Sequence, residues 1–502
     1  MSVNQLAFLM LVGISVIFYY LVPKRVQWVF LLLVSLVFYR LMGVHNFLYI
    51  LLAAVVLTVG TGQMTGQPKK LRRRWLVGIL VILLGLLAGL KYGDFLIENL
   101  NHGCALWGLS PINQLGLVAP LGISYYTLQG IGYALEVYRG KAKPNKNPLK
   151  TLLFLTYYPQ MTQGPIGRYM QLAPQLFAGH SFSFAILGRG CRRILWGLFK
   201  KAVVADQLRP LVNNIFDNYQ SVSGLTLFIG CIYMAVQMYA DFSGYTDLVW
   251  GISELYGIEL TENFKRPFFS KSLGEYWRMW HISLSFWFRD YVFYPASVSK
   301  RALRFARFGK KHISPRIGKI CPVLYAMSIV WVCTGLWHDA SWRYILWGVA
   351  NGVVLISGVL FAPTLKRIKE RLHIRENAPW WKGFCMMRTV LLVALLKVFP
   401  GADTTGQSFV FLKKIFCEFQ PVFARSTFFL DTEPGTLCII ALGLCLMLMV
   451  SILEERGNSI GTLLVARPPA VRWLIYLAVL TMLIFLGNFD AAVTGGFEYA
   501  QF

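Results

Sequence analysis

Acidic residues are scarce in this chain of 502 residues. Asp and Glu number 23 against 49 Lys and Arg, so the formal net charge is +26. Charged residues of all kinds reach only 14 %, whereas a typical soluble domain has about 25 %. Hydrophobic residues instead make up 56 %. This composition excludes a string of ordinary soluble domains, which the length alone would have suggested.

Several common site patterns are also missing from the sequence. The nine cysteines contain no CxxC pair and lie mostly inside apolar runs, which argues against a disulfide framework or a zinc site. No HxxxH or HExxH spacing and no phosphate-binding glycine loop occurs. The sequence therefore predicts no metal site and no bound cofactor.

Long apolar runs recur along almost the whole chain, with basic residues between them. Their approximate positions are 5–22, 26–42, 45–60, 75–90, 114–137, 150–163, 184–205, 223–240, 322–337, 343–361, 386–399, 436–453 and 471–487. Runs near the minimum length for a membrane helix, about 17 residues, need not all span. We predict an all-α, polytopic membrane protein with about 11–13 transmembrane or re-entrant helices. The first run lacks a preceding basic segment, so we interpret it as a retained helix and not a signal peptide.

Basic residues gather in four short segments between apolar runs. These segments are Lys69–Arg74, Arg139–Lys150, Lys300–Lys319 and Lys366–Arg375. Short basic loops face the cytoplasm in multi-pass proteins, so we expect a cell-membrane protein with these loops inside. Because the segments are separated by apolar runs and carry no binding module, the charge does not indicate nucleic-acid binding.

The stretch 241–295 combines many aromatic residues with many ionisable ones. Such groups are costly in lipid unless they line a wet cavity or lie at the interface, so we expect function here. On one continuous helix, an aromatic face would be shared by Trp277, Trp280, His281, Leu284 and Phe288. From this pattern alone, a packed histidine is the favoured interpretation of His281.

His338 follows the apolar run 322–337 and precedes a second run after Asp339–Ser341. The two runs predict a hairpin whose tip points away from the cytoplasm. Sixteen helical residues rise about 24 Å, less than the roughly 30 Å hydrocarbon core, so the imidazole should lie within the membrane profile. The residues alone leave two interpretations open: a structural histidine, or a base or proton relay.

Several blocks in the same order resemble the membrane-bound O-acyltransferase family. The resemblance is to its bacterial branch, which serves alginate O-acetylation or teichoic acid D-alanylation. The blocks are PLGISYYTLQGIGYALEVYRG (120–140), YYPQMTQGPIGRY (157–169), YADFSGYTDLVWG (239–251), NFKRPF to RDYVFYP (263–295), GLWHDASWRYILWGVANG (335–352) and the ending FEYAQF. The resemblance implies three segments: N-terminal membrane helices in 1–113, a catalytic core in 114–362 and C-terminal membrane helices in 363–502.

The resemblance also assigns roles to residues of this chain. His338 matches the family's catalytic histidine, and His281 matches a second motif histidine, so the resemblance implies that both are catalytic. Five further residues in the matching blocks are substrate-binding candidates for which structural roles remain equally open: Asp241, Asp247, Trp277, Arg289 and Asp290. The glycine that usually follows the Trp-His pair is replaced here by Asp339, which adds a negative charge beside the imidazole.

The resemblance implies transfer of an acyl group, with acetyl favoured, from a cytoplasmic thioester to an extracytoplasmic polysaccharide. Acetyl-CoA would be the donor substrate, and the partners would be membrane lipid, the polysaccharide acceptor and an extracytoplasmic SGNH-type acyltransferase. One alternative is D-alanyl transfer to teichoic acid from a cytoplasmic acyl-carrier protein. An alternative of another class is a proton-coupled transporter or flippase, against which the lack of inverted repeats argues.

Overall fold

The computed structural model describes residues 6–42, 47–161, 163–420 and 425–489 of the chain. Within these ranges the regular structure is helical, apart from one isolated bridge between Phe264 and Trp280. The predicted all-α class is confirmed. The terminal block FEYAQF, quoted above, lies outside the described residues.

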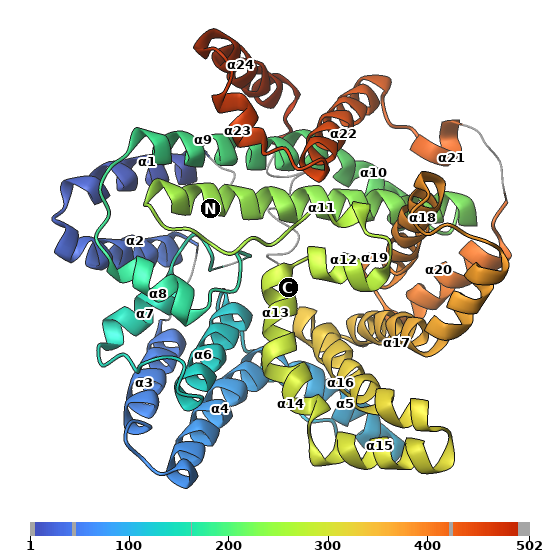
Figure 1. Cartoon of the computed structure of the whole chain (residues 1–502), viewed down its shortest axis with the longest axis horizontal. Coiled ribbons are helices and arrows are strands. Elements are labelled where there is room, and N and C mark those ends of the chain that lie inside the picture. Colours follow the sequence, from blue (N-terminus) through green and yellow to red (C-terminus); the bar gives the residue numbers. More distant parts are fainter. Residues whose placement is uncertain (1–5, 43–46, 162, 421–424, 490–502) are drawn as a thin grey trace. The chain divides into compact units, whose positions relative to one another are not determined.

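The chain divides into two compact units, and α11 (Gly224–Leu255) contributes to both. Figure 1 labels the helices named below. The first unit comprises residues 1–194 and 246–261. Its helices are α1 (Leu6–Leu21), α2 (Gln27–Leu41), α3 (Leu48–Gln63), α4 (Lys69–Lys91), α5 (Gly93–Leu106), α6 (Ile123–Tyr138), α7 (Pro148–Thr156), α8 (Tyr169–Phe177) and most of α9 (Phe184–Phe199).

The second unit comprises residues 195–245 and 262–502. Its helices up to the hairpin are the π-helical η2 (Lys200–Ala205), α10 (Asp206–Asp217), η3 (Pro267–Phe269), α12 (Leu273–Met279), α13 (Ile282–Phe288), η4 (Arg289–Phe293), α14 (Tyr294–Ser297), α15 (Lys300–His312), α16 (Pro315–His338) and α17 (Trp342–Arg371). The later ones are α18 (Pro379–Leu395), α19 (Val398–Gly401), α20 (Thr405–Cys417), α21 (Arg425–Phe429), α22 (Pro434–Glu455), α23 (Ile460–Val465) and α24 (Pro469–Leu486).

Seven helical segments of the described chain are long and apolar enough to cross a membrane. They lie in α4, α11, α16, α17, the α18–α19 segment, α22 and α24. Two shorter apolar helices, Ala7–Leu21 and Leu48–Gln63, accompany them. A helix of about 20 residues is needed to cross the hydrocarbon core. The chain is a multi-pass membrane protein, as predicted.

Three of the predicted runs do not form long helices. The run near 114–137 begins in non-helical backbone, and its helix α6 starts only at Ile123. Gly122 precedes α6 with φ 76°, and a Cβ at this position would overlap the Met161 carbonyl oxygen. The run near 150–163 yields only the nine-residue α7, and the run near 184–205 changes to π-helix at Lys200. Backbone geometry therefore interrupts these segments where apolarity alone predicts continuity.

A buried polar network joins helices of the first unit. The Tyr256 hydroxyl lies 2.6 Å from the Ser15 hydroxyl and 2.9 Å from that of Tyr158. Tyr157 and Ser253 hydroxyls lie 3.0 Å apart. These hydrogen bonds satisfy hydroxyl groups in an otherwise apolar interior, where an unpaired polar group would be costly.

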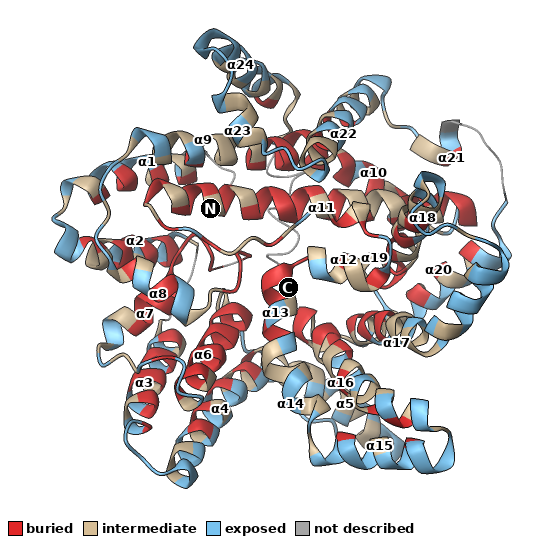
Figure 2. Cartoon of the chain, in the orientation of Figure 1, coloured by how far each residue is buried: buried red, intermediate tan, exposed pale blue. Residues whose placement is uncertain are grey.

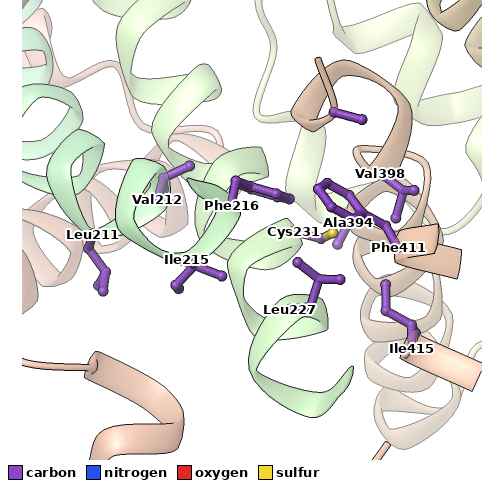
Figure 3. Packing of buried hydrophobic residues seen from close by; sticks show 11 residues of the cluster. Leu211, Val212, Ile215, Phe216, Leu227, Cys231, Ala394, Val398, Phe411 and Ile415 are labelled. Carbon is purple, nitrogen blue, oxygen red and sulfur yellow. The ribbon is translucent and has the colours of Figure 1, made fainter. Parts of the chain in front are cut away.

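The second unit has an apolar core built from α10, α11 and α18 to α20 (Figure 3). Its members include Leu211, Ile215, Phe216, Leu227, Cys231, Ala394, Val398 and Phe411. Cys231 is fully buried in this core, where it packs as a small apolar side chain. Figure 2 shows this burial pattern along α10 and α11, in contrast to the largely exposed basic helix α15.

Helices α16 and α17 form the predicted hairpin, with the connection at Asp339–Ser341. They approach closely because Gly335 and Gly348 lie at the crossing, where a Cβ would overlap the carbonyl oxygens of Tyr344 and Trp331 respectively. The prediction of a short first helix is wrong: α16 has 24 residues and rises about 36 Å. This length exceeds the hydrocarbon core, so shortness of the helix does not explain the burial of His338.

Candidate active site

A cavity of about 330 Å³ lies in the second unit. It contains both motif histidines in its wall, and its volume falls within the range of small-molecule sites. The lining comes from α12, α13, η4, α16 and α17. It consists of Gly274, Trp277, Arg278, Trp280, His281, Leu284, Ser285, Phe286, Phe288, Arg289, Phe293, Met327, Val330, Trp331, Thr334, His338 and Leu355.

His338 is the last residue of α16 and is only 4 % exposed. Its imidazole packs among three aromatic rings. The ring centroids of Trp347, Trp337 and Tyr344 lie 5.0, 5.1 and 6.1 Å from that of His338. The helix end and these rings fix the position of the imidazole at the cavity wall.

His281 lies at a break between α12 and α13, so the predicted continuous helix through the aromatic stripe is wrong. The residue has φ 47°, in the left-handed region, where non-glycine residues are uncommon. Two backbone hydrogen bonds of 3.0 Å join this break to residues 263–265. They run from Lys265 N to Met279 O and from Ile282 N to Asn263 O. This extended pairing replaces helical hydrogen bonds and holds His281 in an unusual conformation.

Asn263 positions the His281 loop through its side-chain oxygen. Its Oδ1 accepts hydrogen bonds from the backbone N and the hydroxyl of Ser283, at 3.1 and 2.8 Å. The same oxygen lies 3.3 Å from Nδ1 of His281. Because this oxygen acts as an acceptor, Nδ1 carries the proton and Nε2 has the lone pair. The contact therefore selects the tautomer of His281.

The His281 side chain is 2 % exposed and lies outside the candidate membrane spans. Burial lowers the pKa of its imidazole to about 3, because a charged ring would be poorly solvated there. The imidazole is neutral at physiological pH. Its ring centroid lies 4.9 Å from that of Phe242 and 6.0 Å from that of Trp337, which also contacts His338. One indole thus contacts both imidazoles.

Two of the five substrate-binding candidates, Trp277 and Arg289, line the cavity. The Trp277 indole donates to Asn351 Oδ1 at 3.2 Å, and its backbone oxygen accepts from the Ser285 hydroxyl at 2.8 Å. Asp290 is not among the lining residues but pairs with Arg289, with Nε 2.7 Å from its Oδ1. The candidate roles of these three residues in substrate binding stay predictions.

The two remaining candidates form ion pairs away from the lining. Asp241 lies with Asp206 against Lys201, whose Nζ is 2.7 Å from one oxygen of each carboxylate; all three side chains are at most 1 % exposed. Asp247 belongs to the first unit, where the Arg193 Nε lies 3.0 Å from its Oδ1. These contacts support structural roles, which sequence analysis left open for both residues.

Three residues of the second unit were not among the site residues predicted from the sequence. Asn263 stands at the start of a quoted block, but nothing in the pattern reveals its contact with His281. Lys201 and its neighbour Lys200 lie in an apolar run, where a buried lysine is expected to pair with a carboxylate. Arg278 lies one residue from Trp277, and its place in the cavity wall becomes visible only in the structure.

Negative charge next to His338 is partly balanced. The Asp339 carboxylate lies 3.8 Å from Nη2 of Arg343, one turn along α17. Among the described residues no group of three or more His, Cys, Asp or Glu side chains could hold a metal ion. The site therefore offers imidazole, guanidinium and aromatic groups for chemistry.

Comparisons with known proteins agree with the blocks quoted above. Residues 145–387 match the model of the membrane-bound O-acyltransferase family. A probable alginate O-acetylase of Azotobacter vinelandii is 32 % identical over 340 residues, which cover 67 % of this chain and 64 % of that protein. A peptidoglycan O-acetyltransferase of Helicobacter pylori is 30 % identical over 353 residues, 65 % of this chain and 63 % of that protein.

A teichoic acid D-alanyltransferase of Bacillus subtilis is also similar, at 30 % identity over 261 residues, 50 % of this chain and 62 % of that protein. The match spans less than two thirds of the length of each of these relatives. The matched segment 145–387 contains both histidines and every residue of the cavity wall. The chain belongs to the membrane-bound O-acyltransferase family.

Proposed function

We propose that this protein transfers an acetyl group from a thioester donor toward a hydroxyl group of a cell-envelope polysaccharide. The observation that carries the proposal is the shared cavity: His338 and His281, from separate sequence blocks, line one wall within the segment that matches the family. The O-acetyltransferase names of two relatives support acetyl as the group transferred.

In the proposed mechanism, His338 is the general base. A hydroxyl group is a weak nucleophile, so a neutral imidazole removes its proton as the oxygen attacks the thioester carbonyl carbon. The carbonyl π electrons move onto oxygen and form a tetrahedral oxyanion. When this intermediate collapses, the C–S bond breaks, the ester forms, and the leaving thiolate takes the proton from the imidazolium. Atoms and charges balance without a further reactant.

His281 contributes a second imidazole whose protonation state is fixed by its surroundings. Nδ1 is held by Asn263, and burial keeps the ring neutral. We assign it a positioning role in the cavity wall. The developing oxyanion needs a donor or a positive charge nearby, and the guanidinium of Arg289 in the same wall is the group we propose for it.

Acetyl is favoured over D-alanyl on two grounds. The match to the O-acetyltransferases covers 65–67 % of this chain, whereas the match to the D-alanyltransferase covers 50 %. The lining contains two arginines and neither Asp nor Glu. A D-alanyl group carries an ammonium, which such a wall does not stabilise.

The proposed donor, loop orientation and partner are those implied by the resemblance to the bacterial branch of the family. The donor would be cytoplasmic acetyl-CoA, and the basic loops would face the cytoplasm. An extracytoplasmic SGNH-type partner would complete transfer to the polysaccharide. An acyl-carrier protein would replace CoA only if D-alanyl were the group transferred.

The proposal is tested with membrane vesicles that contain the protein, its polysaccharide acceptor and the partner acyltransferase. Vesicles with the wild-type chain or with His338→Ala receive acetyl-labelled CoA or a D-alanyl-labelled carrier. We expect label from acetyl-CoA in polysaccharide or partner, and its loss in the variant. Equal transfer by both chains would contradict the role of His338, and transfer from the D-alanyl carrier alone would favour D-alanylation.

A further inference from the structure

The charge of the cavity wall is one-sided. Arg278 and Arg289 are its charged residues of fixed sign, and no carboxylate lines it. Aromatic rings and aliphatic side chains form most of the remaining surface. An anion that occupies the cavity would displace water from these guanidinium groups, so less solvent would screen the pair than in open water.

The two arginines differ in what surrounds them. Arg289 is held by Asp290, with contacts of 2.7 Å from Nε to Oδ1 and 3.3 Å from Nη2 to Oδ2. Its guanidinium carbon also lies 4.5 Å from the centre of the Phe286 ring. The protein itself thus supplies both an anion and a stacking surface to Arg289.

Arg278 has no such partner in the described part of the chain. Its side chain is exposed, and neither a hydrogen bond nor an ion pair joins it to another described residue. The backbone beneath it is nevertheless fixed, since the neighbouring Trp277 is bonded to Asn351 and Ser285. The fixed turn of α12 therefore places the Arg278 guanidinium in the cavity wall, and no carboxylate among the described residues pairs with it.

We propose that Arg278 binds an oxyanion of the substrate, a phosphate or a carboxylate, when the substrate occupies the cavity. This inference rests on the proposed function, because it assumes that a thioester donor or a polysaccharide acceptor enters there. The oxyanion could come from either substrate. It would be the phosphate of a phosphopantetheine arm on the donor or the carboxylate of an acidic sugar on the acceptor. Both match the planar fork of a guanidinium, which can donate two parallel hydrogen bonds.

Equilibrium binding to the full-length protein in lipid nanodiscs tests the inference without turnover. The donor arm of the experiment compares 4′-phosphopantetheine with pantetheine. The acceptor arm compares a uronic-acid oligosaccharide with its neutral counterpart. We expect one of these pairs to show about tenfold tighter binding of the anionic form, and Arg278→Gln to abolish that difference.

Two matched variants separate charge from structure. Arg278→Lys keeps the charge and should restore part of the preference. Arg301→Gln removes an exposed arginine from α15, outside the cavity, and should keep all of it. An equal affinity for charged and neutral forms in the wild type, or an unchanged preference in Arg278→Gln, would overturn the inference. The proposed function fails separately, through absence of label transfer in the vesicle assay.

Discussion

The buried ion cluster of Lys201, Asp206 and Asp241 provides a sharp test of how the second unit is held together. Lys201→Met removes the cation but keeps most of the side-chain volume. Two carboxylates at 2.7 Å from the former Nζ would then face each other in an interior that excludes water. Breaking a buried pair in this way costs about 3–5 kcal/mol, since the remaining charges are uncompensated.

The expected shift in apparent melting temperature follows from the size of the chain. An unfolding entropy of about 2.1 cal/mol/K per residue gives about 1 kcal/mol/K for 502 residues. The loss therefore corresponds to roughly 3–5 °C if the chain unfolds as one unit. Thermal unfolding in nanodiscs, followed by intrinsic tryptophan fluorescence, measures the shift. Lys310→Met, on the exposed face of α15, is the matched control and should melt like the wild type.

The triple variant Lys201→Met, Asp206→Asn, Asp241→Asn removes the charges together. We expect it to recover at least half of the stability lost in the single variant, because no unpaired charge remains buried. A single variant that melts within about 1 °C of the wild type would refute the reasoning. A triple variant less stable than the single one would do the same.

Three further predictions concern the cavity and its supports. Gly335→Ala should destabilise the α16–α17 hairpin by more than about 1 kcal/mol, because the new methyl group overlaps the facing backbone. Gly358 has open space around it, so Gly358→Ala is the control and should not destabilise the hairpin. Thermal unfolding measures both variants. Asn263→Leu removes the acceptor that orients His281 and Ser283, so acetyl transfer should fall at least about tenfold, and transfer equal to wild type would contradict the role of that oxygen. In the unfolded chain the His281 imidazole takes up a proton near pH 6.5, whereas in the folded chain it stays neutral at that pH. The free energy of unfolding should therefore fall as the pH decreases below about 6.5, by up to roughly 1.4 kcal/mol per pH unit. His281→Gln should flatten this slope in melting curves between pH 4.5 and 6.5, and an unchanged slope would show that other groups cause it.

Much of the fold could be predicted from local pattern. Apolar periodicity and length identify the helices that cross the membrane, and the polar turn at Asp339–Ser341 identifies the α16–α17 hairpin. The helix predictions that were wrong concern segments in which backbone geometry interrupts the helix. The run near 114–137 looks continuous in composition, yet its helix begins only after Gly122, whose positive φ no apolar scale detects.

The candidate site was predictable in its histidines but not in its geometry. The aromatic stripe around His281 has helical spacing, so the sequence favours one helix through it. In the structure the pairing of Trp280 with Phe264 interrupts that helix. Such a contact between distant segments leaves no trace in local periodicity.

The charged candidates show the same limit. Asp241 and Arg289 both lie in conspicuous blocks, but one is buried against Lys201 and the other lines the cavity. Their surroundings depend on which face each helix presents after packing. The sequence identifies the ionisable residues, whereas the assignment of partners requires the tertiary structure. The predicted three-segment division of the chain and the orientation of its loops stay predictions.

Photolabelling with an acetyl-CoA analogue that carries a photoreactive acyl group tests most directly whether this cavity is the acyl-transfer site. Peptides of the irradiated protein are mapped by mass spectrometry, with excess acetyl-CoA as competitor. We expect competed labelling in 274–293 and 327–338, the two segments that contribute most of the cavity wall. Competed labelling confined to the apolar groove between α18 and α20, with none in those segments, would contradict the account.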